Sequence, residues 1–162
     1  KMKIIGIVGW KNSGKTFYVS EIIKKLKSKN YRVASIKHAH HEFDIDRYNT
    51  DSYIHRKSGS SQVIISSSKR WAKISELEKQ DEKKLDELIN ELSETDIVLV
   101  EGYKNESHPK IEIISENKKE HLFQKIKNVR AIISDIGIDT HLKKFKKNEI
   151  DKIVNFILNE IK

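Results

Sequence analysis

Residues 4–16, with the sequence IIGIVGWKNSGKT, join an apolar run to a short segment of glycine and polar residues. The apolar run KIIGIVG, residues 3–9, is nearly continuous, which is typical of a strand buried on both faces of a parallel sheet. Apolar residues then recur at helical spacing over residues 15–28. We therefore expect a strand, a tight turn and a helix in direct succession.

The turn between this strand and this helix carries the pattern G-x-x-x-x-G-K-T, which is typical of loops that bind nucleotide phosphates. Its glycines allow backbone angles that a Cβ atom would block, and its backbone N–H groups can then surround an anion at the positive end of the helix dipole. The lysine can reach the β- and γ-phosphates, and the threonine hydroxyl can bind Mg²⁺. The predicted nucleotide-binding residues are Gly9, Trp10, Lys11, Asn12, Ser13, Gly14, Lys15 and Thr16.

Strand-like and helix-like segments alternate along the rest of the chain, which is typical of a parallel sheet covered by helices on both faces. The predicted strands are residues 32–38, 62–67, 71–75, 96–102, 109–115 and 129–135, and the predicted helices are residues 51–60, 81–93 and 148–162. We expect a single α/β domain over residues 1–162, with three layers, a mostly parallel sheet and P-loop NTPase topology. Ligands of such sheets bind at the carboxyl ends of the strands, so the residues that follow each strand are the candidates for a site.

An acid that helps to hold Mg²⁺ should stand at the end of an apolar strand, close to the phosphates. The segment DIVLVEG, residues 96–102, offers Asp96 at its start and Glu101 at its end. At about 3.3 Å per residue, five residues place Asp96 roughly 16 Å from the far end of the strand. We therefore predict that Glu101, together with Thr16, binds Mg²⁺ or its bound water. A surface ion pair between Glu101 and Lys104 is the alternative.

A polar loop, IKHAHHEFDID, residues 36–46, follows the second predicted strand. His38 and His40 alternate onto one side of it, and Asp46 is the predicted further partner of Mg²⁺. The pattern leaves three interpretations open: an active-site loop, a dedicated transition-metal site, or a solvated loop. The residues predicted to meet a second anionic ligand or a partner are Lys37, His38, His40, His41, Arg56 and Lys104.

A further carboxylate, Asp135, ends the predicted strand VRAIISD, residues 129–135. At that position it could accept two N–H bonds from the edge of a guanine base, so we predict that it belongs to the nucleotide-binding residues. A turn or helix-capping role for Asp135 is the alternative. The spacing of these motifs does not by itself distinguish guanine from adenine.

The composition favours a cytoplasmic protein that binds neither membranes nor nucleic acids. The net charge is +8, but the lysines are scattered over helical segments, and arginine, which nucleic-acid readers favour, occurs at only five positions. The chain has no cysteine, which fits a reducing compartment. No apolar run approaches the roughly 20 residues that a membrane-spanning helix needs.

Several motifs together resemble the MobB family, the adaptor proteins of molybdopterin-guanine dinucleotide biosynthesis. They are GWKNSGKT, IKHAHHEFDID, DSYIHRKSGS, RWAKIS, DIVLVEGYK with PKIEI, and IISD, in family order over residues 4–138. The resemblance implies a homodimer that binds GTP with Mg²⁺, hydrolyses it weakly, and assists the guanylyltransferase MobA; molybdopterin is a further implied ligand. The phosphate-binding residues of the family correspond to Gly14, Lys15 and Thr16, and its Walker B acid corresponds to Glu101.

A small-molecule P-loop kinase is the alternative function. Such a kinase clamps the transferred phosphoryl group with several arginines from a closing lid. The scarcity of arginine and the lack of a lid-like insertion favour the adaptor. The sequence shows no catalytic glutamine or arginine finger, so hydrolysis should be slow unless a partner completes the site.

Overall fold

The computed structural model of the chain describes residues 2–79 and 81–162. It divides into two compact units. The sheet unit comprises the chain up to His38 and again from Leu85 onward, and the hairpin unit comprises Ala39–Lys84. The prediction of one domain across the whole chain stays a prediction.

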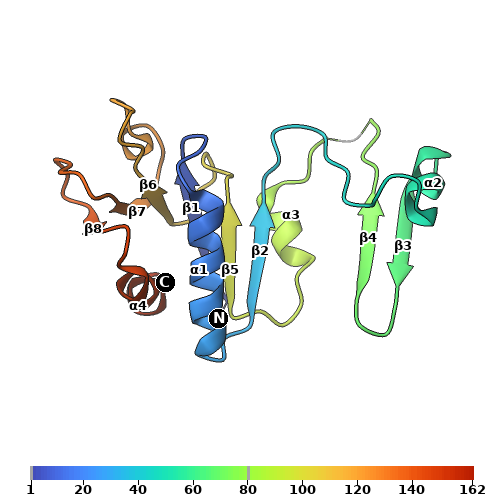
Figure 1. Cartoon of the computed structure of the whole chain (residues 1–162), viewed down its shortest axis with the longest axis horizontal. Helices are drawn as coiled ribbons and strands as arrows, with labels where there is room; N and C mark the ends of the chain where they lie inside the picture. The colour runs from blue at the N-terminus through green and yellow to red at the C-terminus, as the bar shows by residue number, and fades with distance from the viewer. Residues whose placement is uncertain (1, 80) are drawn as a thin grey trace. The chain divides into compact units, whose positions relative to one another are not determined.

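The sheet unit is built on a six-stranded parallel sheet with the strand order β2-β5-β1-β6-β7-β8 (Figure 1). Its strands are β1 (Lys3–Gly9), β2 (Val33–Lys37), β5 (Ile97–Glu101), β6 (Lys110–Ile113), β7 (Val129–Ile133) and β8 (Lys143–Phe145). Its helices are α1 (Lys15–Ser28), α3 (Leu85–Asn90), α4 (Ile150–Glu160) and the short 3₁₀ helix η1 (Leu122–Gln124).

Helices cover both faces of this sheet. On one face, Ile22 and Leu26 of α1 and Ile153 and Ile157 of α4 pack against alternate side chains of the central strands. On the other face, Leu85 of α3 packs against residues of β5. The three-layer, mostly parallel α/β fold is therefore confirmed.

The register of the strands brings the site residues predicted at the ends of β1, β2 and β5 to one edge of the sheet. Ile7 of β1 and Lys37 of β2 both pair with Glu101, the last residue of β5. The loop after β1 consequently begins beside the carboxyl ends of β5 and β2. Because neighbouring strands are about 4.8 Å apart, residues after these three strands share one rim.

The hairpin unit contains α2 (Asp51–Lys57) and the antiparallel strands β3 (Gln62–Ser66) and β4 (Trp71–Ser75). Val63 is buried, whereas Ile64 and Ile65 on the same strand are exposed. The sequence correctly indicated strands here, and the structure shows that they pair with each other and not with the parallel sheet.

Element boundaries follow the sequence pattern closely in the core and less well elsewhere. The predicted strand 3–9 and helix 15–28 match β1 and α1. The predicted helix 81–93 is shorter, at Leu85–Asn90, and two elements, β8 and η1, were not predicted.

Candidate nucleotide-binding site

The loop between β1 and α1 has the backbone shape that an anion site needs. Gly14 has φ of 94° and Asn12 has φ of 63°, both in the left-handed region. A Cβ atom on Gly9 would lie 2.3 Å from Ser13 Oγ, so the loop closes tightly on itself there. Gly14 caps α1 without a side-chain hydrogen bond, so no side chain from the cap covers the first N–H groups of the helix.

Ser13 supplies a second sign that the loop is built for a ligand. Its hydroxyl oxygen is buried and has no hydrogen-bond partner among the described residues. A buried polar group without a partner is costly, and such groups usually mark a position for an ion, a water or a ligand.

The ammonium group of Lys15 lies against this loop. Its Nζ donates to the carbonyl oxygens of Gly9, at 3.0 Å, and Trp10, at 2.9 Å. An ammonium group has three N–H donors, so a third remains for a phosphate oxygen. Burial lowers the pKa of Lys15, and Glu101 opposes this shift by raising the pKa.

The predicted metal-binding pair is in contact. Thr16 Oγ1 lies 3.2 and 3.3 Å from the two carboxylate oxygens of Glu101. Glu101 is buried and its Oε1 is also 3.3 Å from Lys37 Nζ. Among the described residues, the Glu101 carboxylate therefore pairs with Lys37. The alternative that the sequence suggested was an ion pair with Lys104.

The other acid of the same strand segment lies at the opposite end, as the strand-length argument predicted. Asp96 accepts hydrogen bonds from the backbone and guanidinium of Arg32. These bonds lower the pKa of Asp96 to about 2.

Trp10 and its neighbours extend the site beyond the phosphate loop. Trp10 Nε1 donates to the carbonyl oxygen of Glu120 at 2.9 Å, while Lys104 and Lys118 place their Nζ atoms 5.7 and 5.9 Å from the indole ring centre. Lys11, which was also predicted to bind nucleotide, is exposed.

Asp135 lies just beyond β7, at the same edge of the sheet. Its Oδ1 accepts the backbone N–H of Lys147 at 2.9 Å, which matches the turn role that the sequence left open. Asp135 is exposed, and a carboxylate has capacity for further donors. Its role as a base reader stays a prediction.

The histidine and acid loop is divided between the two units. His38 stacks on Tyr103 within the sheet unit, with ring centres 4.5 Å apart, whereas His40 and His41 belong to the hairpin unit. In that unit, Arg56 binds Asp46 through two hydrogen bonds, of 2.7 and 3.2 Å. These bonds lower the pKa of Asp46, and its predicted role at Mg²⁺ stays a prediction.

Arg56 also binds two further carboxylates, Asp44 at 2.6 Å and Glu76 at 3.2 Å. Its side chain is almost fully buried, at 9% exposure, so within the described structure it organises the hairpin unit. Within residues 2–79 and 81–162, no three His, Cys, Asp or Glu side chains gather as a metal cluster.

Two buried ionisable residues of β6, Lys110 and Glu112, and the partly buried His108 before them were not predicted as a group. Lys110 donates to the carbonyl oxygens of Glu106, His108 and Lys127, and Glu112 accepts the backbone N–H groups of η1 at 2.7 Å. Lys110 and Glu112 are two positions apart in the strand KIEI, so their side chains lie on the same face of the sheet. This spacing is the feature of the sequence from which the pair could have been predicted.

His108 makes stability depend on pH. Both ring nitrogens are buried without a partner among the described residues, and burial, aided by Lys110, lowers the pKa of His108 from 6.5 to about 4. The unfolded chain thus binds more protons between these values, so stability should fall as pH drops from about 6.5 to 4. Allowing for solvent screening, we expect about 1–2 kcal/mol from this group.

Urea unfolding at pH 7 and at pH 4 measures this effect. His108→Gln should lose less stability than the unsubstituted chain over the same interval, because glutamine does not titrate. Equal losses in the two proteins would contradict the assignment.

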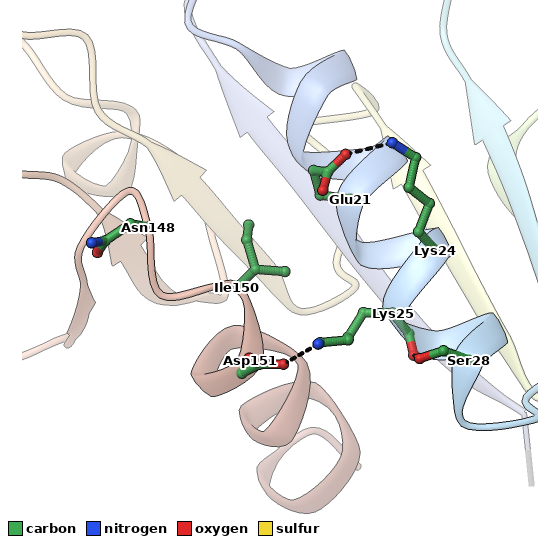
Figure 2. A pocket seen from close by; sticks show the side chains of 7 residues that line it. All are labelled: Glu21, Lys24, Lys25, Ser28, Asn148, Ile150 and Asp151. Carbon is green, nitrogen blue, oxygen red and sulfur yellow. Dashed lines mark hydrogen bonds and ion pairs between the residues drawn. The ribbon is translucent and has the colours of Figure 1, made fainter.

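A shallow pocket lies between α1 and the start of α4 (Figure 2). Its lining is charged, but Lys24 pairs with Glu21 and Lys25 pairs with Asp151, each at 2.7 Å. The pocket is thus lined by groups that neutralise one another, and it is formed by later turns of α1 than those that hold Lys15 and Thr16.

Within the described part of the chain, no helix is both long and apolar enough to cross a membrane.

Comparison with known proteins gives consistent matches. The family described as molybdopterin guanine dinucleotide synthesis protein B, MobB, matches residues 4–135. A molybdopterin-guanine dinucleotide biosynthesis adapter protein of Haemophilus influenzae is 34% identical over 161 residues, which is 98% of this chain and 89% of the relative. Its namesake in Escherichia coli is 29% identical over 159 residues, or 96% of this chain and 91% of the relative.

Two solved structures have a fold similar to that of nearly the whole chain. The crystal structure of a molybdopterin-guanine biosynthesis protein B has a TM-score of 0.79 at 26% identity, covering 98% of this chain and 99% of the other. The crystal structure of Bacillus subtilis MobB has a TM-score of 0.78 at 23% identity, covering 99% of both chains.

Proposed function

The chain belongs to the MobB family, and from this premise we propose that it is a GTP-binding adapter protein of molybdopterin guanine dinucleotide biosynthesis. Relatives that align with nearly the whole chain carry the adapter name, which supports the role. We further propose that the chain assists a MobA-type guanylyltransferase and hydrolyses GTP weakly.

The observation that carries GTP binding is the loop after β1. It combines the Ser13 hydroxyl, which has no partner among the described residues, the left-handed Gly14, and the Lys15 ammonium group at the start of a helix that has no side-chain cap. Each of these features favours a phosphate group, and together they suit a chain of phosphates.

Mg²⁺ fits the donors beside this loop. Thr16 and Glu101 offer only oxygen atoms, which are the ligands that Mg²⁺ prefers, and they already lie within 3.3 Å of each other. Mg²⁺ is commonly held by one or two carboxylates together with substrate phosphates, so a larger cluster of acids is not required. When bound, the ion would neutralise charge on the β- and γ-phosphates.

Guanine recognition is proposed to involve Asp135. Guanine presents two adjacent N–H donors to a carboxylate, and adenine does not. We expect Asp135→Asn to weaken GTP binding about 10- to 100-fold, the range for a hydrogen bond to a charged group, while ATP binding stays the same.

Competition of GTP and ATP for the unsubstituted chain and for Asp135→Asn tests this proposal. An unchanged GTP/ATP ratio in the variant would remove Asp135 as the reader. A preference for ATP in the unsubstituted chain would overturn the GTP assignment itself.

Two of the five arginines, Arg56 and Arg32, support an adapter over the alternative kinase. Arg56 is held by three carboxylates of the hairpin unit, and Arg32 is held by Glu94 and Asp96 at the far end of β5. Neither is thus available to clamp a transferred phosphoryl group. Phosphoryl transfer from GTP to any member of a small-molecule acceptor panel would favour the kinase.

A homodimer is supported by apolar side chains of the hairpin unit. Several large ones are exposed, namely Phe43, Ile45, Tyr48, Ile64 and Ile65. Large contiguous apolar patches on a protein surface are typical of interaction surfaces. Sedimentation velocity measures the state directly, and a monomer at micromolar concentration would contradict the proposal.

A further inference from the structure

Three loops of the sheet unit meet at the indole ring of Trp10. Trp10 itself belongs to the phosphate loop after β1, Lys104 belongs to the loop after β5, and Lys118 and Glu120 belong to the loop after β6. The two lysine ammonium groups lie within 6 Å of the ring centre, the range of favourable cation–π contact. Trp10 therefore joins the phosphate loop to both neighbouring loops.

The 115–121 loop, which follows β6, is fixed at further points, one of which is the ion pair between the Glu120 carboxylate and Lys125. Glu116 pairs with Lys147 at 2.7 Å, and the segment immediately after the loop is held where Glu112 accepts the N–H groups of Leu122 and Phe123. Both ties between this loop and the phosphate loop run through Trp10. Lys118 lies over its ring, and its Nε1 donates a hydrogen bond to the carbonyl oxygen of Glu120. An indole N–H is a donor only, and phenylalanine lacks it.

The strand order shows which part of a nucleotide this loop would face. The Thr16–Glu101 contact places the metal, and hence the β- and γ-phosphates, on the β5 side of β1. β6 lies on the opposite side of β1. A triphosphate bound in this direction directs its α-phosphate and nucleoside toward the 115–121 loop.

We propose that Trp10 is a positioning residue that holds the 115–121 loop at the nucleoside side of the site through its hydrogen bond to Glu120. This inference rests on the proposed nucleotide-binding function. It assigns Trp10 a role in the affinity for the nucleoside, whereas the phosphate chain is bound by the loop backbone and Lys15.

Titration calorimetry of Trp10→Phe with two probes, GTP and inorganic tripolyphosphate, each with Mg²⁺, tests the assignment. Phenylalanine keeps an aromatic face for the lysines but removes the N–H donor. We expect GTP binding to weaken about three- to tenfold, the range for one hydrogen bond, and tripolyphosphate binding to stay the same. Trp71→Phe, at the other tryptophan, is the matched control and should change neither.

Unchanged GTP affinity in Trp10→Phe would overturn the proposal, and so would an equal loss for both probes, because the indole would then act on the phosphate loop alone. Failure of the proposed function looks different: the unsubstituted chain and Lys15→Ala would bind GTP equally.

Hydrogen exchange without any ligand gives an independent readout. Trp10→Phe should accelerate exchange in peptides that cover residues 115–121 and leave α1 unchanged, because the loop loses one of its ties. Identical exchange in the loop would also overturn the proposal.

Discussion

Lys15→Ala should raise the Kd for GTP by about 100-fold or more. A hydrogen bond to a charged group contributes about 1.5–3 kcal/mol, and the positive charge of the ammonium group also attracts the β- and γ-phosphates that the third donor does not reach. The Lys15 side chain is already held at the loop by Gly9 and Trp10, so little ordering opposes its contact with a ligand. Titration calorimetry with GTP and Mg²⁺ measures the loss.

The fold should survive this substitution. Burial lowers the pKa of Lys15, which means that the folded chain bears a desolvation cost for this charge, and alanine removes that cost. We expect a midpoint of urea unfolding that is unchanged or slightly higher. Lys24→Ala, on the same helix but 70% exposed and paired with Glu21, is the matched control and should bind GTP normally. Equal affinity in Lys15→Ala and in this control would contradict a phosphate-binding loop.

The sequence predicted the centre of the fold well because local and tertiary preferences agree there. β1 is nearly continuous in apolar residues, and its place in the middle of the sheet buries it on both faces. The glycines and the helical spacing after β1 predict a tight turn followed by a helix, and the structure has this turn and the helix α1.

The short strand β8, at the end of the sheet, was not predicted. β8 spans only three residues, two of which are exposed lysines, so no apolar pattern marks it as a strand. The hairpin β3–β4 was read as strands, but its pairing within a separate unit depends on contacts that periodicity does not encode. The ion cluster around Arg56 likewise joins residues 10 to 20 positions apart.

In the candidate site, the sequence best predicted the position of the acid beside the phosphate loop, because the distance along a strand distinguishes the two candidates. Asp96 and Glu101 are both carboxylates, and the length of the strand was the criterion that favoured Glu101. The structure places Glu101 beside Thr16 and Asp96 beside Arg32. The contact of Trp10 with Glu120 was not predictable, because it joins residues 110 positions apart through a backbone oxygen.

Glu101→Gln should remove most of the benefit that Mg²⁺ gives to GTP binding. The carboxylate lies beside the Thr16 hydroxyl and the Lys37 ammonium group, so it would hold Mg²⁺ or its bound water next to the phosphates. Loss of a residue that supports a bound metal commonly costs about 10- to 100-fold in metal affinity. Glutamine keeps the size of the side chain and removes its charge.

The ratio of the Kd values for GTP in EDTA and in Mg²⁺ isolates this effect. In the unsubstituted chain the ratio should be large, whereas in Glu101→Gln it should approach one, and binding in EDTA should be equal or tighter because a negative charge no longer repels the phosphates. Asp96→Asn changes the other acid of the same strand segment in the same way. It should leave the ratio intact, because Asp96 is engaged with Arg32 at the opposite end of β5. A ratio that stays large in Glu101→Gln, or that falls equally in both variants, would show that Glu101 does not support the ion.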